Sequence, residues 1–258
     1  MKSILFAILL LSVTYTSCLP IRNTSLTDLE KEGRLIYQLE RCHDSAQTYC
    51  LDLLRFGKKV RITVYDIISY LEDGKLLFVA YDTAKIAILQ GEFDIASGNI
   101  VNAVVRDRTL TPREDSLAQI CKKVDSLRSA LEPDGAQRYR LIAYIGDDHV
   151  ARVYIYPREE NRRELVWGND YLVTFNSLTT SGEVRQLHNT ANRNAYAASE
   201  LTSHNHNEDD FFIAADYFRL LKVRDKVTWK QHTIYGKSRH RSWTIDMNTM
   251  GVSQLIVP

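Results

Sequence analysis

Proline, glycine and cysteine are all scarce in this sequence. The chain of 258 residues holds 5 prolines, 11 glycines and 4 cysteines. That composition excludes a collagen-like or low-complexity chain and a small domain framed by disulfides. The net charge of +1 is spread evenly, without the clustered basic patch that nucleic-acid binding requires. The 45% content of hydrophobic residues indicates a folded protein of one large or two small domains.

Several familiar chemical motifs are also missing. The sequence has no Gly-rich phosphate loop, no serine-centred nucleophile elbow and no His-Glu-x-x-His. It has no Cys-x-x-Cys either, which leaves a thioredoxin-like or zinc-ribbon interpretation unsupported. After the N-terminus there is no run of about 20 apolar residues that could span a membrane.

The N-terminus reads as a targeting segment over residues 1–18. Lys2 supplies a positive charge, and residues 4–11 form an apolar stretch of signal-peptide length. Either a signal peptidase cuts near Ser17, or Cys18 is the acylated first residue of a bacterial lipoprotein; the Ser-Cys ending favours the lipoprotein. Both routes export the protein, as a periplasmic or outer-membrane lipoprotein or in secreted form.

The other three cysteines are Cys42, Cys50 and Cys121. Cys42 and Cys50 would lie about 12 Å apart in one continuous helix, at about 1.5 Å per residue, which is too far for a disulfide. They can pair only if the chain bends around Asp44 and Ser45.

Hydrophobic periodicity predicts an α+β fold, with a helical and mixed N-terminal half and an antiparallel-sheet C-terminal half containing one buried helix. We expect region boundaries at 1–18, 19–135 and 136–258. The clearest helix begins at Thr111, where Thr111 and Glu114 form a capping box, and ends before Pro133. Helices are also predicted over 27–39, 46–54 and 211–222. Strands are predicted over 75–81, 84–93, 100–105, 139–145, 150–156, 165–167, 171–175, 183–188, 227–235, 242–246 and 252–257. Residues 60–71 fit a strand or a helix, and residues 189–198 read as a polar loop.

The stretch with most chemical content runs from Ser203 to Lys222. His204 and His206 are two apart on an extended segment, so their side chains point to the same side. The helix that follows is apolar almost all the way round, except for Asp216, and Asp209 or Asp210 is its expected N-cap. A carboxylate on an apolar arc needs a partner.

A metal ion held by His204, His206 and Asp216 would be such a partner. Two imidazoles and a carboxylate, with a fourth position open to water, is a catalytic zinc arrangement. Zinc is therefore the expected cofactor. The alternatives are that the His-x-His segment is a solvated loop, and that Asp216 pairs with Arg219, Arg224 or the backbone of a strand.

The C-terminal order is a strand hairpin, a strand ending in His-x-His, a helix bearing an aspartate, and three strands. This order resembles the JAMM metalloprotease fold, a zinc isopeptidase domain. The resemblance implies that His204, His206 and Asp216 are zinc ligands and that a glutamate activates the bound water. Here ten residues separate His206 from Asp216, one fewer than is usual in the family. Ile213 or Ala214 takes the serine position, and Asn207 takes that of the proline that often follows the second histidine. The candidate glutamates are Glu164, Glu183 and Glu200.

Residues 150–258 are also similar to a group of uncharacterised bacterial secreted proteins. The shared features are Gly168-Asn169-Asp170-Tyr171, Arg185-Gln186-Leu187-His188 and the later His-x-His. This resemblance implies export and raises His188 as an additional ligand or a residue that supports one, although a surface position on its strand is the preferred interpretation. We expect His149, His232 and His240 at the surface, and Trp167, Trp229 and Trp243 in strands of the core.

These observations favour an exported or membrane-anchored envelope protein with a degenerate metal site, which binds a protein or a cell-envelope component. The alternatives are a zinc-dependent JAMM-like peptidase or isopeptidase, and a secreted effector. No nucleic-acid partner is expected, and the membrane is expected as a partner only through a lipid on Cys18.

Overall fold

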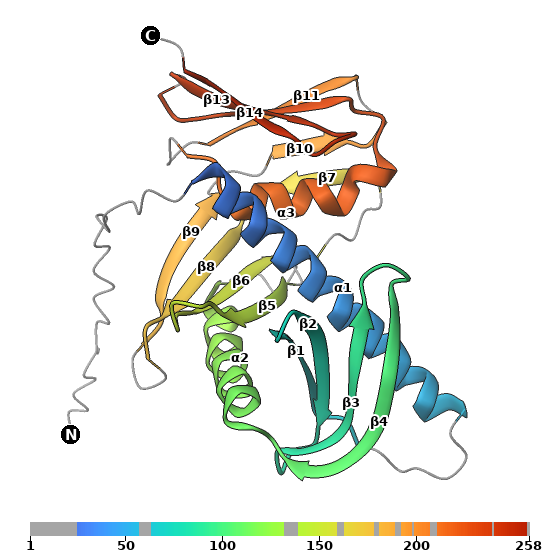
Figure 1. Cartoon of the computed structure of the whole chain (residues 1–258). Coiled ribbons are helices and arrows are strands. Elements are labelled where there is room, and N and C mark those ends of the chain that lie inside the picture. The colour runs from blue at the N-terminus through green and yellow to red at the C-terminus, as the bar shows by residue number, and fades with distance from the viewer. Residues whose placement is uncertain are drawn as a thin grey trace, which may run out of the picture.

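The computed structural model describes residues 25–56, 63–131, 139–158, 163–177, 181–188, 192–197, 199–206, 211–238 and 240–256. The predicted signal segment and Cys18 lie outside this range. Within it the fold is α+β, as predicted, with three α-helices and mostly antiparallel sheets (Figure 1). None of the described helices combines the length and the apolar character needed to span a membrane.

The N-terminal half is one long helix, a four-stranded sheet and a second helix. The sheet has the order β1-β2-β3-β4 and is antiparallel throughout. The elements are α1 (Leu26–Phe56), β1 (Asp66–Glu72), β2 (Lys75–Tyr81), β3 (Ile86–Asp94), β4 (Asn99–Thr109) and α2 (Pro112–Leu131). The predicted capping box begins α2, because the Glu114 amide donates to Thr111 Oγ1 and the Thr111 amide donates to the Glu114 carboxylate.

The C-terminal half contains two four-stranded sheets and a short strand pair. One sheet has the order β5-β6-β8-β9, the other has the order β11-β12-β13-β14, and β7 pairs with β10. The strands of the first sheet are β5 (Tyr139–Ile145), β6 (Ala151–Pro157), β8 (Asp170–Phe175) and β9 (Glu183–His188). The short pair is β7 (Glu164–Trp167) with β10 (Asn192–Ala195). The last sheet consists of β11 (Leu201–Asn205), β12 (Gln231–Tyr235), β13 (Arg241–Asp246) and β14 (Val252–Ile256).

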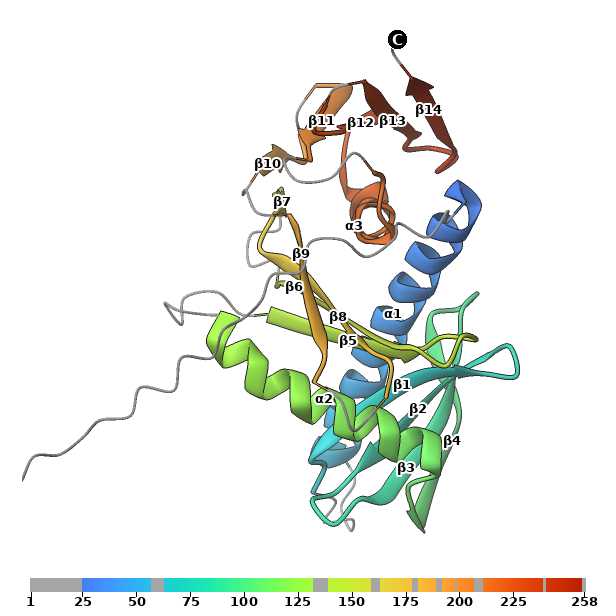
Figure 2. The same cartoon turned by 90° about the vertical axis from the view of Figure 1, so that its left-hand side faces the viewer.

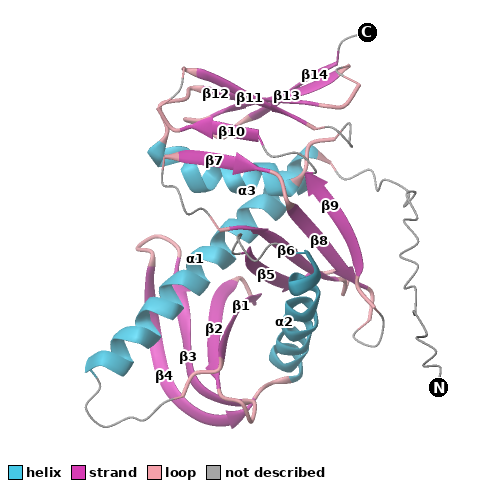
Figure 3. Ribbon diagram, turned by 180° about the vertical axis from the view of Figure 1, so that it is seen from behind, coloured by secondary structure: helices cyan, strands magenta, loops and turns pink. Residues whose placement is uncertain are grey.

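The third helix, α3 (Ala214–Val223), joins β11 to β12 and continues into a short 3₁₀ helix, Arg224–Lys226. These two strands are parallel, because the intervening helix returns the chain to the starting edge of the sheet. Figures 2 and 3 show α3 lying beneath the sheet β11–β14, between that sheet and α1. As predicted, α3 is buried on nearly every side, with Lys222 as the exception.

Two predicted boundaries are wrong in the first helix. The segments predicted over 27–39 and 46–54 are one helix of 31 residues, and Ser25 caps it through a bond from the Asp28 amide. The helix is continuous because its buried face runs on at helical spacing through Ile36, Leu39, Cys42, Ala46 and Cys50. The small side chains of Cys42, Ala46 and Cys50 make the apolar pattern hard to recognise in the sequence, which explains the predicted gap between two helices.

One open alternative is settled and two other expectations need correction. Of the ambiguous residues 60–71, those from Asp66 onward form strand β1. The predicted polar loop 189–198 contains strand β10, whose polar residues suit its exposed position beside β7. Trp229 is buried as predicted, but it lies before β12 rather than in a strand.

The largest core cluster joins the two halves of the chain. It includes Ile36 and Leu39 of α1, Phe78 of β2, Tyr154 of β6 and Phe218 of α3, all at most 5% exposed. Helix α1 runs diagonally past α3 at one end and past the sheet β1–β4 at the other (Figure 1). The helix therefore connects the predicted regions 19–135 and 136–258.

Candidate metal centre

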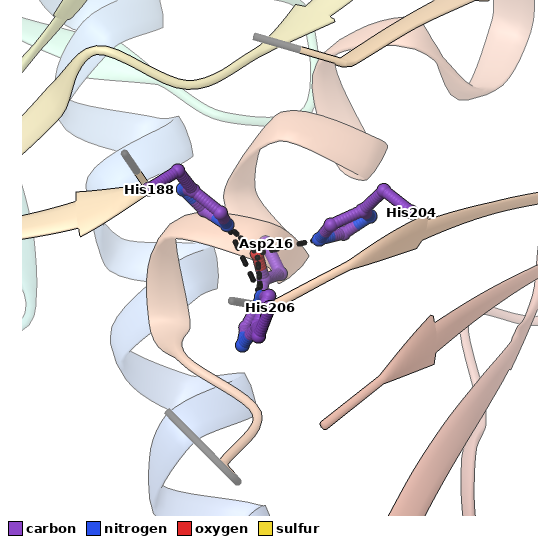
Figure 4. Close-up of side chains that lie close together, drawn as sticks. All are labelled: His188, His204, His206 and Asp216. Carbon is purple, nitrogen blue, oxygen red and sulfur yellow. Dashed lines mark hydrogen bonds and ion pairs between the residues drawn. The ribbon is translucent and has the colours of Figure 1, made fainter. Parts of the chain in front are cut away.

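Four ligating side chains from three elements meet beside α3. His188 ends β9, His204 lies in β11, His206 directly follows β11, and Asp216 lies in the first turn of α3. Their exposed fractions are between 0% and 5%. Figure 4 shows the three imidazole rings pointing at the Asp216 carboxylate from different sides. The structure thus brings together His204, His206 and Asp216, the three residues proposed from the sequence, and adds His188.

The distances between the ligating atoms suit one small cation. His188 Nε2 lies 3.0 Å from Asp216 Oδ1 and 3.1 Å from His206 Nε2. His206 Nε2 and His204 Nε2 lie 3.3 Å and 3.5 Å from Asp216 Oδ1. A tetrahedral site with metal–ligand bonds of about 2.0–2.1 Å has edges of about 3.3 Å. All four ligating atoms lie within 4.8 Å of one another, so the cluster could hold a metal ion.

The outer nitrogen of each ring has a partner that fixes the ring. His206 Nδ1 donates to the Phe211 carbonyl oxygen at 2.8 Å, so its Nε2 keeps the lone pair that faces the cluster. His188 Nδ1 lies 2.7 Å from the Asp170 carboxylate, which likewise holds a proton on that nitrogen. Partners of this kind orient imidazoles that bind metals and raise their basicity.

The third ring, His204, is held by a chain of hydrogen bonds and by stacking. Its Nδ1 lies 2.8 Å from His232 Nε2, and His232 Nδ1 lies 2.8 Å from Thr202 Oγ1. Trp167 stacks on the His204 ring, with centroids 3.9 Å apart and planes 19° apart. The predicted surface position of His232 is therefore wrong: its ring is fully buried and supports His204.

His204 Nε2 is the one buried imidazole nitrogen of the described residues without a hydrogen-bond partner. Burial lowers the pKa of His204 to about 3, so the ring is neutral and its free nitrogen faces the cluster. A buried polar atom without a hydrogen-bond partner destabilises the folded state, unless a ligand bonds to it.

Asp216 is positioned by the backbone at the start of α3. The Ile213 amide donates to Asp216 Oδ2 at 3.0 Å, which leaves Oδ1 directed at the imidazoles. The expected cap at Asp209 or Asp210 is wrong, because Ile213 is the N-cap of this helix. Burial alone would raise the pKa of Asp216, but its close contacts with His206 and His188 outweigh burial and hold that pKa well below its usual value.

His188 differs from His204 in the direction of its pKa shift. Burial acts to lower its pKa, but Asp170 and Asp216 outweigh burial and raise it to about 10. Asp170 is itself buried and lies 3.7 Å from the guanidinium Nη1 of Arg219, which is 1% exposed. Arg219 therefore supports Asp170 and not Asp216, contrary to one alternative considered from the sequence; Arg224 pairs with Asp225.

The preferred surface position for His188 is also wrong, since the ring is 5% exposed. The available signal was Asp170, which pairs with His188 across β8 and β9. None of the proposed glutamates belongs to the cluster. Glu164 pairs with Arg193, Glu200 pairs with Lys230, and Glu183 is exposed in β9.

Comparison of the chain with protein-family models, curated proteins and solved structures finds no match. What the fold and the site define is an α+β protein with a buried three-histidine, one-aspartate cluster that could hold a metal ion.

Proposed function

We propose that this chain is an exported envelope protein that holds a divalent metal ion, zinc, as a structural element of its C-terminal half. The observation that carries this proposal is the position of His188. It supplies a fourth protein ligand, and four protein ligands are typical of a structural zinc site, whereas a catalytic site keeps one position for water.

The types of ligand in the cluster support zinc as the metal and are compatible with an exported protein. Imidazole and carboxylate groups bind zinc without a thiolate, so an oxidising compartment would not damage the site. The three cysteines that the structure describes lie elsewhere, and all are free. The absence of a thiolate ligand is compatible with export, and the proposal of export itself rests on the signal-like residues 1–18. Fractionation of cells that express the full chain tests the anchor, because Cys18→Ala should move a lipoprotein out of the membrane fraction.

Metal analysis of the protein purified from residue 19 onward tests the site. We expect about one equivalent of zinc per chain, the stoichiometry of a single four-ligand site. His204→Ala and Asp216→Ala should lose the metal, and His149→Ala, at an exposed histidine outside the cluster, should keep it. Wild type that is free of metal after incubation with zinc, and that unfolds as the two ligand variants do, would overturn the proposal.

A JAMM-like zinc peptidase is the second candidate, and one observation favours it. His204, His206 and Asp216 lie at the end of a strand and the start of the next helix, as that resemblance implies. His188 would then have to leave, or the zinc would have to become five-coordinate to bind water. Hydrolysis of an isopeptide-linked substrate by the zinc-loaded protein, lost in His204→Ala, would establish this candidate over a structural role.

The remaining alternative, a secreted effector, shares the signal and the histidines. No observation in the structure favours it over an envelope protein. A toxic phenotype on expression of the exported chain, absent in the ligand variants, would be its first evidence.

A further inference from the structure

A cavity of about 790 Å³ lies apart from the candidate metal centre. Its walls come from α1, β1, α2 and β5, including Leu39, Asp66, Cys121 and Leu141, and none of the metal-centre residues lines it. β1 and β5 are edge strands of separate sheets, and no backbone hydrogen bond between described residues joins them. The volume is that of a small-molecule site.

One wall of this cavity carries a carboxylate without a cationic partner. Asp66 Oδ1 accepts a hydrogen bond from the Ile67 amide at 2.8 Å, and Tyr81 Oη donates to Oδ2 at 3.4 Å. Among the described residues no lysine, arginine or histidine nitrogen lies within ion-pair distance of it. Burial raises the pKa of Asp66, because a half-buried carboxylate without a counter-ion is harder to ionise than one in water.

An imidazole faces the same space from α1. Burial is the main cause that lowers the pKa of His43, with Asp66 acting in the opposite direction, so the ring is neutral near pH 7. Within the described ranges His43 has no hydrogen-bond partner. A neutral imidazole offers one acceptor nitrogen, and His43 lines this cavity.

The cations that line the cavity do not neutralise Asp66. Arg140 is engaged by Asp44 at 2.5 Å and by Glu40 at 3.2 Å. Lys122 and Arg158 are exposed at the rim, together with Asp125. The interior of the cavity is therefore anionic, while its rim carries both signs.

Aromatic and apolar groups complete the wall around Asp66. The rings of Tyr65 and Tyr81 meet edge to face, with centroids 5.9 Å apart, and both line the cavity. Aromatic faces attract cations. Ile68, Leu141 and Ile142 supply apolar surface along the two strands.

We propose that this cavity binds a small organic cation, a primary ammonium group attached to an apolar body. An ammonium group has three N–H donors, and the cavity offers three acceptors: the Asp66 carboxylate, the neutral ring of His43 and a tyrosine hydroxyl. The apolar body lies against the aliphatic residues of β1 and β5. This proposal is independent of the metal centre.

Titration calorimetry on the zinc-incubated wild type tests the proposal with hexylammonium chloride as the probe. Neutral 1-hexanol has the same apolar body, and sodium hexanoate has one methylene fewer; both serve as controls. We expect saturable binding of the amine only. Equal binding of hexanol would reduce the site to an apolar cavity, tighter binding of hexanoate would make it an anion site, and absence of saturable amine binding would leave no amine site; each result overturns the proposal.

Two variants identify the site. Asp66→Asn keeps the oxygen that accepts from the Ile67 amide but removes the charge, and should weaken amine binding at least about tenfold. Glu72→Gln removes an exposed carboxylate of the same strand that lies outside the cavity, and should leave binding unchanged. Thermal unfolding of both variants checks that they fold. Equal amine affinity in wild type and a folded Asp66→Asn would contradict the assignment.

Discussion

His188 determines what kind of metal site this cluster could form. Without it, two imidazoles and a carboxylate would leave a coordination position for water, as a hydrolytic zinc site requires. Because His188 Nε2 lies only 3.0 Å from Asp216 Oδ1, a protein nitrogen would occupy that position in the proposed site. The residue that argues for a structural metal is thus the one whose role the sequence left open.

The first prediction concerns Asp170, which holds His188 through its outer nitrogen. We expect Asp170→Asn to lower zinc affinity by about 10–100-fold, because partners of ligating histidines orient the ring and raise its basicity. Competition with a chromogenic chelator measures the affinity. Asp107→Asn, at an exposed position of β4, is the matched control. Unchanged affinity in a folded Asp170→Asn would show that His188 is not a ligand.

Another buried carboxylate, Glu114, belongs to α2 and lies far from the cluster in sequence. It is 0% exposed and accepts hydrogen bonds from Arg108, from Tyr70 Oη and from the Thr111 amide. Burial alone would raise its pKa, but these donors outweigh burial and lower it to about 2. The ionised form therefore stabilises the folded state.

Glu114 should accordingly make stability depend on pH in the acid range. Its stabilisation is complete above the unfolded pKa of about 4.5 and is lost as the pH falls towards about 2. We expect Glu114→Gln to cost about 2–3 kcal/mol of unfolding free energy at pH 7. Urea unfolding of both proteins at several pH values measures the difference, which should shrink on acidification. A difference that is constant with pH would refute the ionic explanation.

At the scale of elements, the contact between α1 and α3 sets the position of Asp216. Gly33 of α1 faces α3 so closely that a Cβ atom would lie 2.8 Å from the Ala214 carbonyl oxygen and 2.9 Å from Tyr217 Cβ. The helices approach there because glycine has no side chain. Lys222 of α3 also pairs with the buried Glu40 of α1 at 2.8 Å.

The third prediction follows from this contact. Alanine at position 33 should gain about 1 kcal/mol of helix propensity, but overpacking typically costs about 1–3 kcal/mol. Because the clash is with backbone, we expect Gly33→Ala to lose about 1–2 kcal/mol of unfolding free energy in urea. A weaker zinc affinity should accompany the loss, since α3 carries Asp216. A more stable variant would mean that the two helices separate without cost.

At the scale of the whole molecule, the long helix α1 joins parts of the chain that the sequence suggested as separate regions. Its residues Ile36 and Leu39 share one core cluster with Tyr154, Tyr156 and Phe218 of the C-terminal half. The proposed metal would add a second connection, between the sheet that ends in β9 and the sheet that begins with β11.

The fourth prediction tests the division at 135. A fragment from Tyr139 to the end lacks α1 and would expose the apolar faces of β6 and α3, so we expect no cooperative thermal unfolding, even with zinc. Circular dichroism and dye binding to exposed apolar surface measure this, with the chain from residue 19 as the control. A cooperative transition in the fragment would establish 136–258 as an independent domain.

Much of this fold was predictable because local chemistry determines it. The capping box at Thr111 and Glu114, the hairpin of β5 and β6 and the buried character of α3 all follow from residues close in sequence. The convergence of His204 and His206 follows equally from the alternation of side chains along one strand. Each of these features depends on residues close together in the sequence, so hydrophobic periodicity and local motifs predict it.

The tertiary structure alone decided which distant residues complete the site. His188 and Asp216 are 28 residues apart, and the buried support from His232 and Asp170 comes from two other strands. The register of β8 with β9 and the packing of α3 against α1 determine these distances. The sequence identifies donors that could bind a metal, but only the packed chain sets which of their nitrogen and oxygen atoms meet, because that depends on the burial of side chains far apart along it.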